Sequence, residues 1–317
     1  MRSLQEKGQD TGQEKGQDKA GVTVLSIDIG GTKTLVSLVR SGRVVKLKTL
    51  ETARDTSPED WFATLRDAVR RWDATYQCVG VAVTGHIENG YWKSVNDKTL
   101  AIGNSFNLAD AVSRFGCPFE ILNDAQAAAW AEYVYGSGSG TDLVYLTVST
   151  GLGGGIVCNG KLLKGHRGLA GHFGQIAQNL MSEDEGAEPI EDMATGRWML
   201  KEAEKAGLNI PAREIFDEAG RGDSWSRRII SASAWRIAKI CRDILYTIDP
   251  PAIVIGGGIG LGKGFIAEVQ HNVAQLAPSQ ETRIRASSIK EHAGIIGVAA
   301  IAAQSYLETG ERHEQIQ

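Results

Sequence analysis

The sequence has little cysteine and no long apolar run. Four cysteines are scattered through 317 residues, at positions 78, 117, 158 and 241. This spacing excludes a Cys-x-x-Cys metal knuckle and argues against a disulfide framework. No apolar run approaches twenty residues, and no signal peptide is recognisable. We therefore expect a cytoplasmic protein without a membrane partner.

An excess of charge of one sign is also missing. The 38 acidic and 34 basic residues give a net charge of −4, and no basic face is visible in the sequence, so no nucleic-acid partner is implied. The hydrophobic content of 42% is that of an ordinary soluble protein, and 317 residues suffice for two domains.

The first 21 residues differ in character from the rest. QEKGQDTG at 5–12 is nearly repeated as QEKGQDKA at 13–20, with almost nothing apolar. Such a segment cannot bury enough surface to offset the entropy of ordering, so residues 1–21 are predicted to form a disordered tail.

Both standard phosphate-binding fingerprints are absent, since neither G-x-x-x-x-G-K-[ST] nor G-x-G-x-x-G occurs. What is present is one pattern used twice: a β-rich run ending in a glycine turn, at 24–33 and again at 143–155. A single turn of this kind is more often only a turn. Two of them predict two related lobes that aim glycine-rich turns at a shared cleft, an arrangement suited to a nucleoside triphosphate.

Strand and helix signals alternate along the remaining chain, which predicts an α/β fold. Ser57 followed by Pro58 is a strong helix start. Strands are expected at 78–83, 119–122, 142–149 and 252–255, and helices at 125–135, 194–206 and 225–248. We expect a small lobe at 22–121, completed by a C-terminal helix at about 298–310, and a large lobe at 122–297.

Asp124 is the candidate catalytic residue, because it lies at a strand-to-helix junction between the two glycine turns. It could act as a general base that accepts the proton of a substrate hydroxyl, or it could merely cap the helix. Asp28, placed just before the first turn, is a candidate for binding Mg²⁺ or its water shell. Lys33 could contact a phosphate or be an exposed strand residue.

The segments 28–33, 123–132 and 147–155 together resemble the ROK family of sugar kinases and sugar-responsive repressors. The similarity runs from about residue 23 to the end of the chain. It implies a two-lobed actin/hexokinase-like (ribonuclease H-like) fold with an interlobe cleft. It also implies ATP and Mg²⁺ as cofactors, a small-molecule sugar as partner, and a homodimer.

Site residues follow from the same resemblance. The catalytic base would be Asp124, and sugar-binding residues would be Gly85, His86, Asn123, His172 and Glu191. The nucleotide would be bound by Asp28, Gly30, Gly31, Thr32, Lys33, Thr150, Gly151, Gly153, Gly154, Gly256 and Gly257.

The sequence departs from the family at its zinc motif. Gln175 stands where members usually carry a histidine, and the stretch 181–189 has no cysteine where they carry a knuckle. Because zinc needs about four nitrogen or sulfur ligands, we expect no structural zinc. His172 and Glu191 would then be held by packing and hydrogen bonds alone.

Three classes of function are compatible with the resemblance: a sugar kinase, a sugar-responsive repressor and a sugar-binding protein without catalytic activity. The segments 123–132 and 168–172 are most similar to family members that phosphorylate the 6-hydroxyl of N-acetylmannosamine in sialic acid breakdown. A kinase for glucose, N-acetylglucosamine or fructose is the alternative within the enzyme class. A repressor is disfavoured because a DNA-reading module needs far more than the roughly 21 residues before the first strand. A silent sugar-binding protein is disfavoured because Asp124 and both turns are intact.

Overall fold

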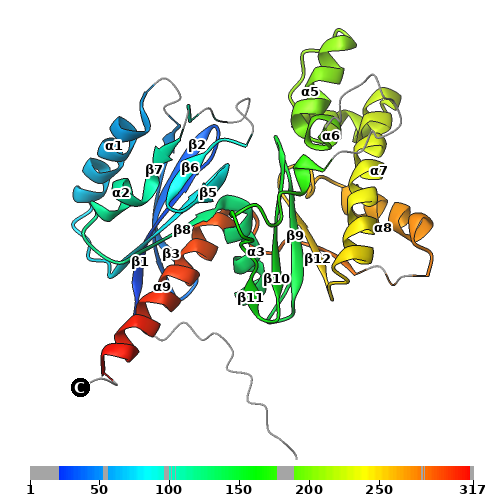
Figure 1. Cartoon of the computed structure of the whole chain (residues 1–317). Coiled ribbons are helices and arrows are strands. Elements are labelled where there is room, and N and C mark those ends of the chain that lie inside the picture. Colours follow the sequence, from blue (N-terminus) through cyan, green and yellow to red (C-terminus); the bar gives the residue numbers. More distant parts are fainter. Residues whose placement is uncertain are drawn as a thin grey trace, which may run out of the picture.

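The structure is a computed structural model, and it describes residues 21–52, 56–95, 100, 102–103, 105–176, 189–279, 281 and 283–314. Two lobes stand side by side (Figure 1). The predicted tail at 1–21 lies outside the described residues except for its last position.

The first lobe is built on a five-stranded sheet in the order β3-β2-β1-β4-β8. Its strands are β1 (Thr23–Ile29), β2 (Lys33–Arg40), β3 (Arg43–Glu51), β4 (Cys78–Val83) and β8 (Phe119–Asn123). Strand β2 is antiparallel to β1 and β3, whereas β4 and β8 run parallel to β1. A small second sheet contains β5 (His86–Glu88), β6 (Tyr91–Lys93) and β7 (Phe106–Asn107).

The second lobe repeats the main sheet with the order β11-β10-β9-β12-β13. Its strands are β9 (Leu143–Val148), β10 (Leu152–Cys158), β11 (Lys161–Leu162), β12 (Ile253–Gly256) and β13 (Ile284–Ala286). The two antiparallel strands lie on one side of β9 and the two parallel strands on the other, as around β1. The two related lobes predicted from the repeated turns are therefore confirmed.

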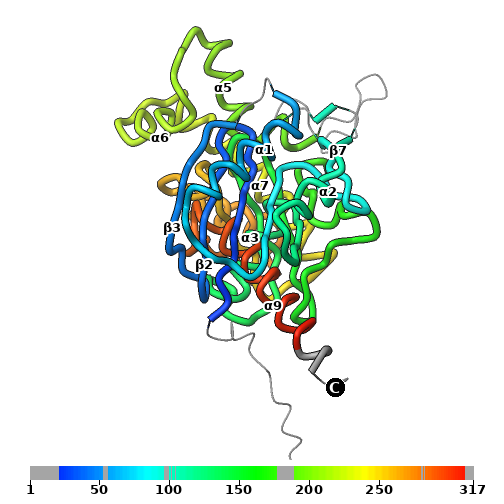
Figure 2. The backbone as a smooth tube through the Cα atoms, turned by 90° about the vertical axis from the view of Figure 1, so that its left-hand side faces the viewer, coloured from blue at the N-terminus to red at the C-terminus, as the bar shows by residue number. Residues whose placement is uncertain are grey.

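Helices cover these sheets and extend beyond them. They are α1 (Pro58–Arg70), α2 (Leu108–Ser113), α3 (Asp124–Val134), α4 (Glu191–Ala194), α5 (Gly196–Lys205), α6 (Ala212–Arg221), α7 (Ser224–Thr247), α8 (Phe265–Leu276) and α9 (Ala293–Glu314). Two 3₁₀ turns are η1 (Phe173–Gln175) and η2 (Lys290–His292). Helices α5 and α6 project above the sheet of the second lobe in both views (Figures 1 and 2).

Helices α3 and α9 pack closely against each other between the two sheets (Figure 1). Helix α3 also contacts β9 and β10 of the second lobe, whereas α9 contacts β1, β2, β4 and β8 of the first. A Cβ atom at Gly297 would lie 1.7 Å from the carbonyl oxygen of Ala127, so only glycine allows this approach. The helix pair therefore joins the lobes next to Asp124.

Most local predictions are confirmed, with shifted ends. Ser57 caps α1 by accepting a hydrogen bond from the amide of Asp60, with Pro58 in the first turn. The C-terminal helix expected at 298–310 spans Ala293–Glu314 instead. Helices α2, α6 and α8 and the small sheet are elements that the sequence analysis did not predict. The division of the chain at 121/122 stays a prediction.

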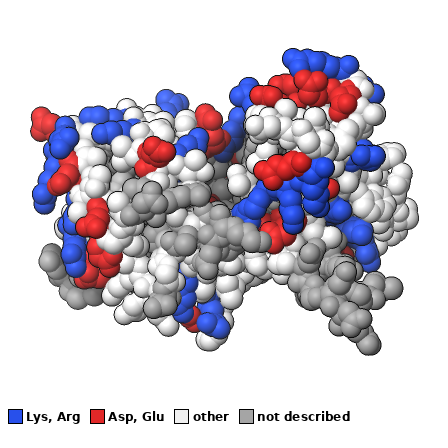
Figure 3. Space-filling model, turned by 90° about the horizontal axis from the view of Figure 1, so that it is seen from above, with Lys and Arg blue, Asp and Glu red and all other residues white. Residues whose placement is uncertain are grey.

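The surface seen in Figure 3 carries charges of both signs. Acidic and basic side chains are intermingled over both lobes on this face. Among the described residues, no helix is long and apolar enough to cross a membrane.

Candidate active site

Asp124 is the first residue of α3 and follows β8 directly. The side chain that caps α3 is that of Asn123, whose Oδ1 accepts hydrogen bonds from the amides of Ala125 (2.9 Å) and Gln126 (3.1 Å). Asn123 Nδ2 donates to the carbonyl oxygen of Gly85 at 2.7 Å. Asp124 Oδ1 accepts a hydrogen bond from the amide of Ala125 at 2.8 Å. The residue that caps α3 is therefore Asn123, and helix capping is not the main role of Asp124.

Two cavities meet at Asp124. The first, of about 260 Å³, is lined by Gly30, Gly31, Thr32, Thr84, Gly85, Ser94, Val95, Leu100, Asn123, Asp124, Thr147, Ser149, Thr150, Gly151, Leu152, Gly153, His172, Gln175 and Glu191. The second, of about 380 Å³, is lined by Asp28, Asp124, Ala125, Ala128, Tyr145, Thr147, Gly257, Gly258, Leu261, Lys290, Glu291, Ala293 and Gly294. Both lie at the carboxyl ends of parallel strands, where ligands bind in open α/β sheets.

The carboxyl groups of Asp124 and Asp28 have unusual acidities. Burial raises the pKa of Asp124 to about 6, and the charge of Glu191 contributes a smaller increase. Burial also raises the pKa of Asp28 to about 7, with a further increase from Asp124 and a decrease from Lys33. A group whose pKa lies near 6 changes protonation close to neutral pH, as a general base must.

Glu191 is held at the wall of the first cavity by groups from three segments. Its side chain is 9% exposed, and its Oε2 accepts a hydrogen bond from Gln175 Nε2 at 3.1 Å. Arg197 Nη2 lies 3.8 Å from Glu191 Oε1. A Cβ atom at Gly151 would lie 2.2 Å from the same oxygen, so this glycine makes room for the carboxylate. Gln175, Arg197 and Gly151 together therefore fix the position of the Glu191 carboxyl group.

His172 lines the same cavity with one ring nitrogen unused. Its Nδ1 lies 3.2 Å from the carbonyl oxygen of Leu169, which requires the proton on Nδ1. The buried Nε2 has no hydrogen-bond partner among the described residues. Burial lowers the pKa of His172 against smaller opposing effects of hydrogen bonds to the backbone of Gly85 and Leu169, so the neutral ring is favoured.

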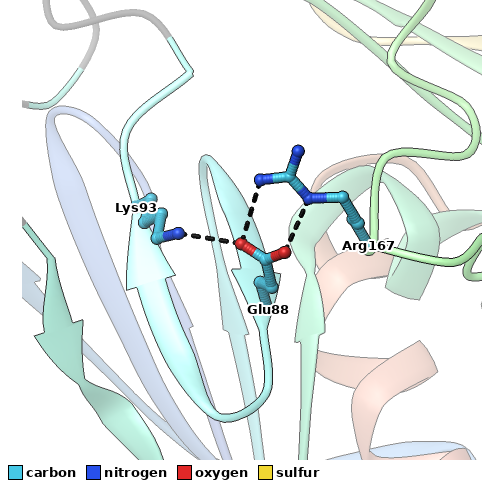
Figure 4. A network of polar contacts seen from close by, with 3 residues as sticks. All are labelled: Glu88, Lys93 and Arg167. Atoms are coloured by element: carbon cyan, nitrogen blue, oxygen red, sulfur yellow. Dashed lines mark hydrogen bonds and ion pairs between the residues drawn. The ribbon is translucent and has the colours of Figure 1, made fainter.

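The loop that carries His172 is bonded to α3 through Gln126 and to β5 through Glu88. Gln126 Nε2 donates to the carbonyl oxygens of Gly168 (3.3 Å) and Ala170 (3.0 Å). Arg167 forms a two-point ion pair with Glu88 of β5, at 2.6 and 3.2 Å (Figure 4).

Glu88 accepts a further hydrogen bond from Lys93 Nζ at 2.8 Å. Arg167 first and Lys93 second lower the pKa of Glu88 to about 2. The ion pair therefore links the His172 loop of the second lobe to the β5–β6 hairpin of the first.

Two further residues predicted to bind the sugar, Gly85 and His86, differ in whether they line a cavity. Gly85 lines the first cavity, whereas His86 lines neither of the two. Neither ring nitrogen of His86 has a hydrogen-bond partner among the described residues. Burial, followed by the neighbouring His172, lowers the pKa of His86.

The first glycine turn forms part of the wall of the first cavity. Gly30, Gly31 and Thr32 line it, and the amide of Gly30 donates to the carbonyl oxygen of Lys33 at 3.1 Å. Lys33 is exposed and lines neither cavity.

The second glycine run forms a turn and also allows close packing against β10. Thr150 and Gly151 form the turn, while Gly153 and Gly154 are already part of β10. A Cβ atom at Gly153 would lie 3.0 Å from the Cβ of Ala125, so this glycine admits α3 against the strand.

Gly154 lines neither cavity and leaves room for the ring of Phe173. Beyond β12, Gly257 lines the second cavity, whereas Gly256 does not.

Comparison with known proteins places this site in a family. A family model described as ROK family matches residues 24–305. The chain belongs to the ROK family.

Two curated relatives are informative. A Brucella melitensis protein named bifunctional enzyme NanE/NanK is 38% identical over 286 residues, covering 90% of this chain and 55% of that protein. The chain thus spans about half the length of that relative. An N-acetylmannosamine kinase of Shigella flexneri is 36% identical over 286 residues, covering 89% of this chain and 98% of the kinase.

Solved structures of ROK proteins confirm the predicted hexokinase-like fold. A ROK hexokinase of Thermus thermophilus is 26% identical with a TM-score of 0.77, covering 92% of this chain and 100% of the hexokinase. A ROK glucokinase of Streptomyces griseus in complex with glucose and AMPPNP is 25% identical with a TM-score of 0.77, covering 89% of this chain and 99% of the glucokinase.

The zinc prediction stays a prediction. No group of three or more histidine, cysteine, aspartate or glutamate residues that could hold a metal occurs within the described parts of this ROK chain. The cysteine-free stretch at 181–189 lies outside those parts except for Pro189. Gln175, at the position where the family resemblance implies a zinc-binding histidine, is described, and it donates a hydrogen bond to Glu191.

Several site residues were missed by sequence reasoning. They include Thr84, Ser94, Tyr145, Thr147, Gln175, Lys290 and Glu291. The pair Thr84-Gly85 after a buried strand was a usable signal, because ligands gather at such strand ends. Lys290 gave none, since an isolated lysine before a helix is ordinarily a solvated residue.

Proposed function

We propose that this protein is an ATP-dependent kinase that phosphorylates the 6-hydroxyl of N-acetylmannosamine and so acts in sialic acid breakdown. The observation that carries the proposal is the position of Asp124, which lines both cavities at their meeting point. A base between a sugar pocket and a nucleotide pocket is what transfer of a phosphoryl group to a hydroxyl needs. The 36% identity to an N-acetylmannosamine kinase over nearly its whole length supports the choice of sugar.

The first cavity is proposed to bind the sugar. The carboxylate of Glu191 accepts hydrogen bonds from sugar hydroxyls, and Nε2 of His172 accepts one more. Asn123 holds the start of α3 and the carbonyl of Gly85 in place through the three hydrogen bonds described above. These contacts orient the 6-hydroxyl toward Asp124.

Asp124 then acts as the general base. Its carboxylate takes the proton of the 6-hydroxyl as that oxygen forms a bond to the γ-phosphorus of ATP. The bond between the γ-phosphorus and the bridging oxygen breaks, and ADP leaves with the electron pair. Burial around Asp124 keeps water away from the phosphoryl group, which limits ATP hydrolysis.

The nucleotide is proposed to occupy the second cavity and to extend its phosphates past Asp124 toward the two glycine turns, which line the first cavity. Asp28 suits a hard cation, because a half-buried carboxylate with a raised pKa gains from a positive partner. Asp28 would hold Mg²⁺ or its water shell, and Mg²⁺ when bound neutralises phosphate charge.

We also propose that the protein is cytoplasmic and forms a homodimer. Light scattering would test the homodimer.

The proposal is tested with a coupled assay of ADP release. MgATP is supplied with N-acetylmannosamine, N-acetylglucosamine, glucose, mannose or fructose in turn. The expected result is a clear preference in kcat/KM for N-acetylmannosamine. Preference for another hexose would keep the kinase and change the sugar, and no turnover with any sugar would refute the kinase.

A further inference from the structure

Lys290 has a backbone conformation unusual for its residue type. Its φ is +60°, in the left-handed region that L-residues with a Cβ rarely adopt. Seven described residues other than glycine have a positive φ, and the remaining six are serine, aspartate or asparagine. Aspartate and asparagine tolerate this region because their short side chains bond locally, whereas lysine has no such compensation. An outlier of this kind motivates a search for function.

The outlier is enforced from the protein interior. The fully buried carboxylate of Glu132 accepts hydrogen bonds through Oε1 from Ser287 Oγ (2.5 Å) and from the amide of Ile289 (3.0 Å). Ser287 Oγ in turn accepts the amide of Lys290 at 3.2 Å. These bonds fix the segment after β13, so the conformation of Lys290 is imposed by its surroundings.

This segment forms one wall of the second cavity, where charge is unevenly distributed. Three acids line that cavity, namely Asp28, Asp124 and Glu291. Of the described residues that line either cavity, Lys290 is the only lysine or arginine. Its side chain makes no hydrogen bond or ion pair with any described residue, so its charge is available to a ligand.

We propose that Lys290 binds a phosphate oxygen of the nucleotide, as the basic ligand of the second cavity. This inference rests on the proposed kinase function. A lysine ammonium is a compact point charge suited to a phosphate oxygen, and a polyphosphate entering a cavity with three carboxylates needs such a counter-charge. The left-handed backbone, held by Ser287 and Glu132, places Lys290 at the wall of this cavity.

Lys290→Gly tests the proposal, because it separates binding from folding. Glycine adopts a φ of +60° without strain, so the melting temperature should equal or exceed that of the wild type. Loss of a bond to a charged group should weaken MgADP binding about tenfold or more in calorimetric titration. Binding of adenosine, which has no phosphate, should change less than about twofold, and Lys290→Arg should retain most MgADP affinity.

Ser41→Gly is the matched control, since Ser41 has a φ of +49° in the β2–β3 turn and lines neither cavity. It should relieve the same kind of strain and leave MgADP affinity unchanged. Equal MgADP affinity of Lys290→Gly and wild type would overturn the proposal, as would an equal loss for MgADP and adenosine. Wild-type protein that binds neither MgADP nor MgATP would overturn the proposed function itself, and this inference with it.

Discussion

Gln175 Nε2 donates a hydrogen bond to Glu191 Oε2 at 3.1 Å, across the wall of the first cavity. The two residues belong to η1 and α4, on either side of the stretch at 177–188. In the family resemblance, Gln175 replaces a zinc-binding histidine. Here its amide orients the very carboxylate that is proposed to bind sugar. The Gln175 amide thus holds the Glu191 carboxyl group at this wall through a hydrogen bond.

Gln175→Glu should therefore weaken sugar binding. The new carboxylate would lie next to Glu191, and two like charges at this distance in a half-buried site repel each other. We expect the KM for the sugar to rise about tenfold or more, with a smaller change in kcat. Gln304→Glu is the control, because Gln304 makes the same type of bond to Glu308 at an exposed position of α9. A KM unchanged in Gln175→Glu would show that Glu191 does not bind the sugar.

Asp124→Asn should remove most turnover and leave sugar binding largely intact. Asparagine keeps the shape but cannot take up the hydroxyl proton, and general bases contribute about 10²- to 10⁴-fold. Steady-state rates together with calorimetric sugar binding check this. Turnover near the wild-type value would place the base elsewhere.

The pH profile of the wild type should report the same group. The base works only when ionised, and the pKa of Asp124 is raised to about 6. The ratio kcat/KM should accordingly be high above pH 6 and fall as the pH drops through about 6. A flat profile between pH 5 and 7 would contradict this role.

Asp28 should make the free protein less stable at high pH. Its folded pKa of about 7 exceeds the unfolded value near 3.8, so between these values the folded state binds more protons. Stability from this group is therefore present at low pH and is lost as the pH rises through about 7. Asp28→Asn should raise the free energy of unfolding by about 1–3 kcal/mol at pH 8 and change it little at pH 4.

Chemical denaturation at the two pH values checks this expectation. Asp217→Asn, at an exposed position of α6, should leave the pH dependence unchanged. An equal effect of Asp28→Asn at both pH values would mean that packing and not ionisation is responsible.

Glu88→Gln should loosen the loop that carries His172. The substitution removes the charge that Arg167 and Lys93 share, and these partners are partly exposed, so the effect should be modest and sensitive to salt (Figure 4). We expect the KM for the sugar to rise about two- to fivefold at low ionic strength and to approach the wild-type value in 1 M salt. Asp110→Asn, which breaks the exposed pair with Arg114 on α2, should have no effect on KM.

Much of the fold could be read from the sequence because its signals are local. The cap at Ser57, the strand before Asp124 and the two glycine turns each depend on hydrogen bonding or periodicity within a few neighbouring residues. The repeated turn predicted two related lobes, and the strand orders of the two main sheets agree with this. Helix α6 was missed although its sequence is amphipathic. The short strands of the small sheet were missed because such strands depend on tertiary packing.

What only the tertiary structure decided is how distant groups meet. The sequence alone determined that Asp124 lies at a strand–helix junction between two glycine-rich turns. It could not show that two cavities meet there, nor that Gln175 would hold Glu191. Glu132 fixes Ser287 from 155 positions away, and this contact exists only because α3 packs against the second sheet and α9. Such long-range contacts depend on the packing of whole lobes, and no local pattern encodes them.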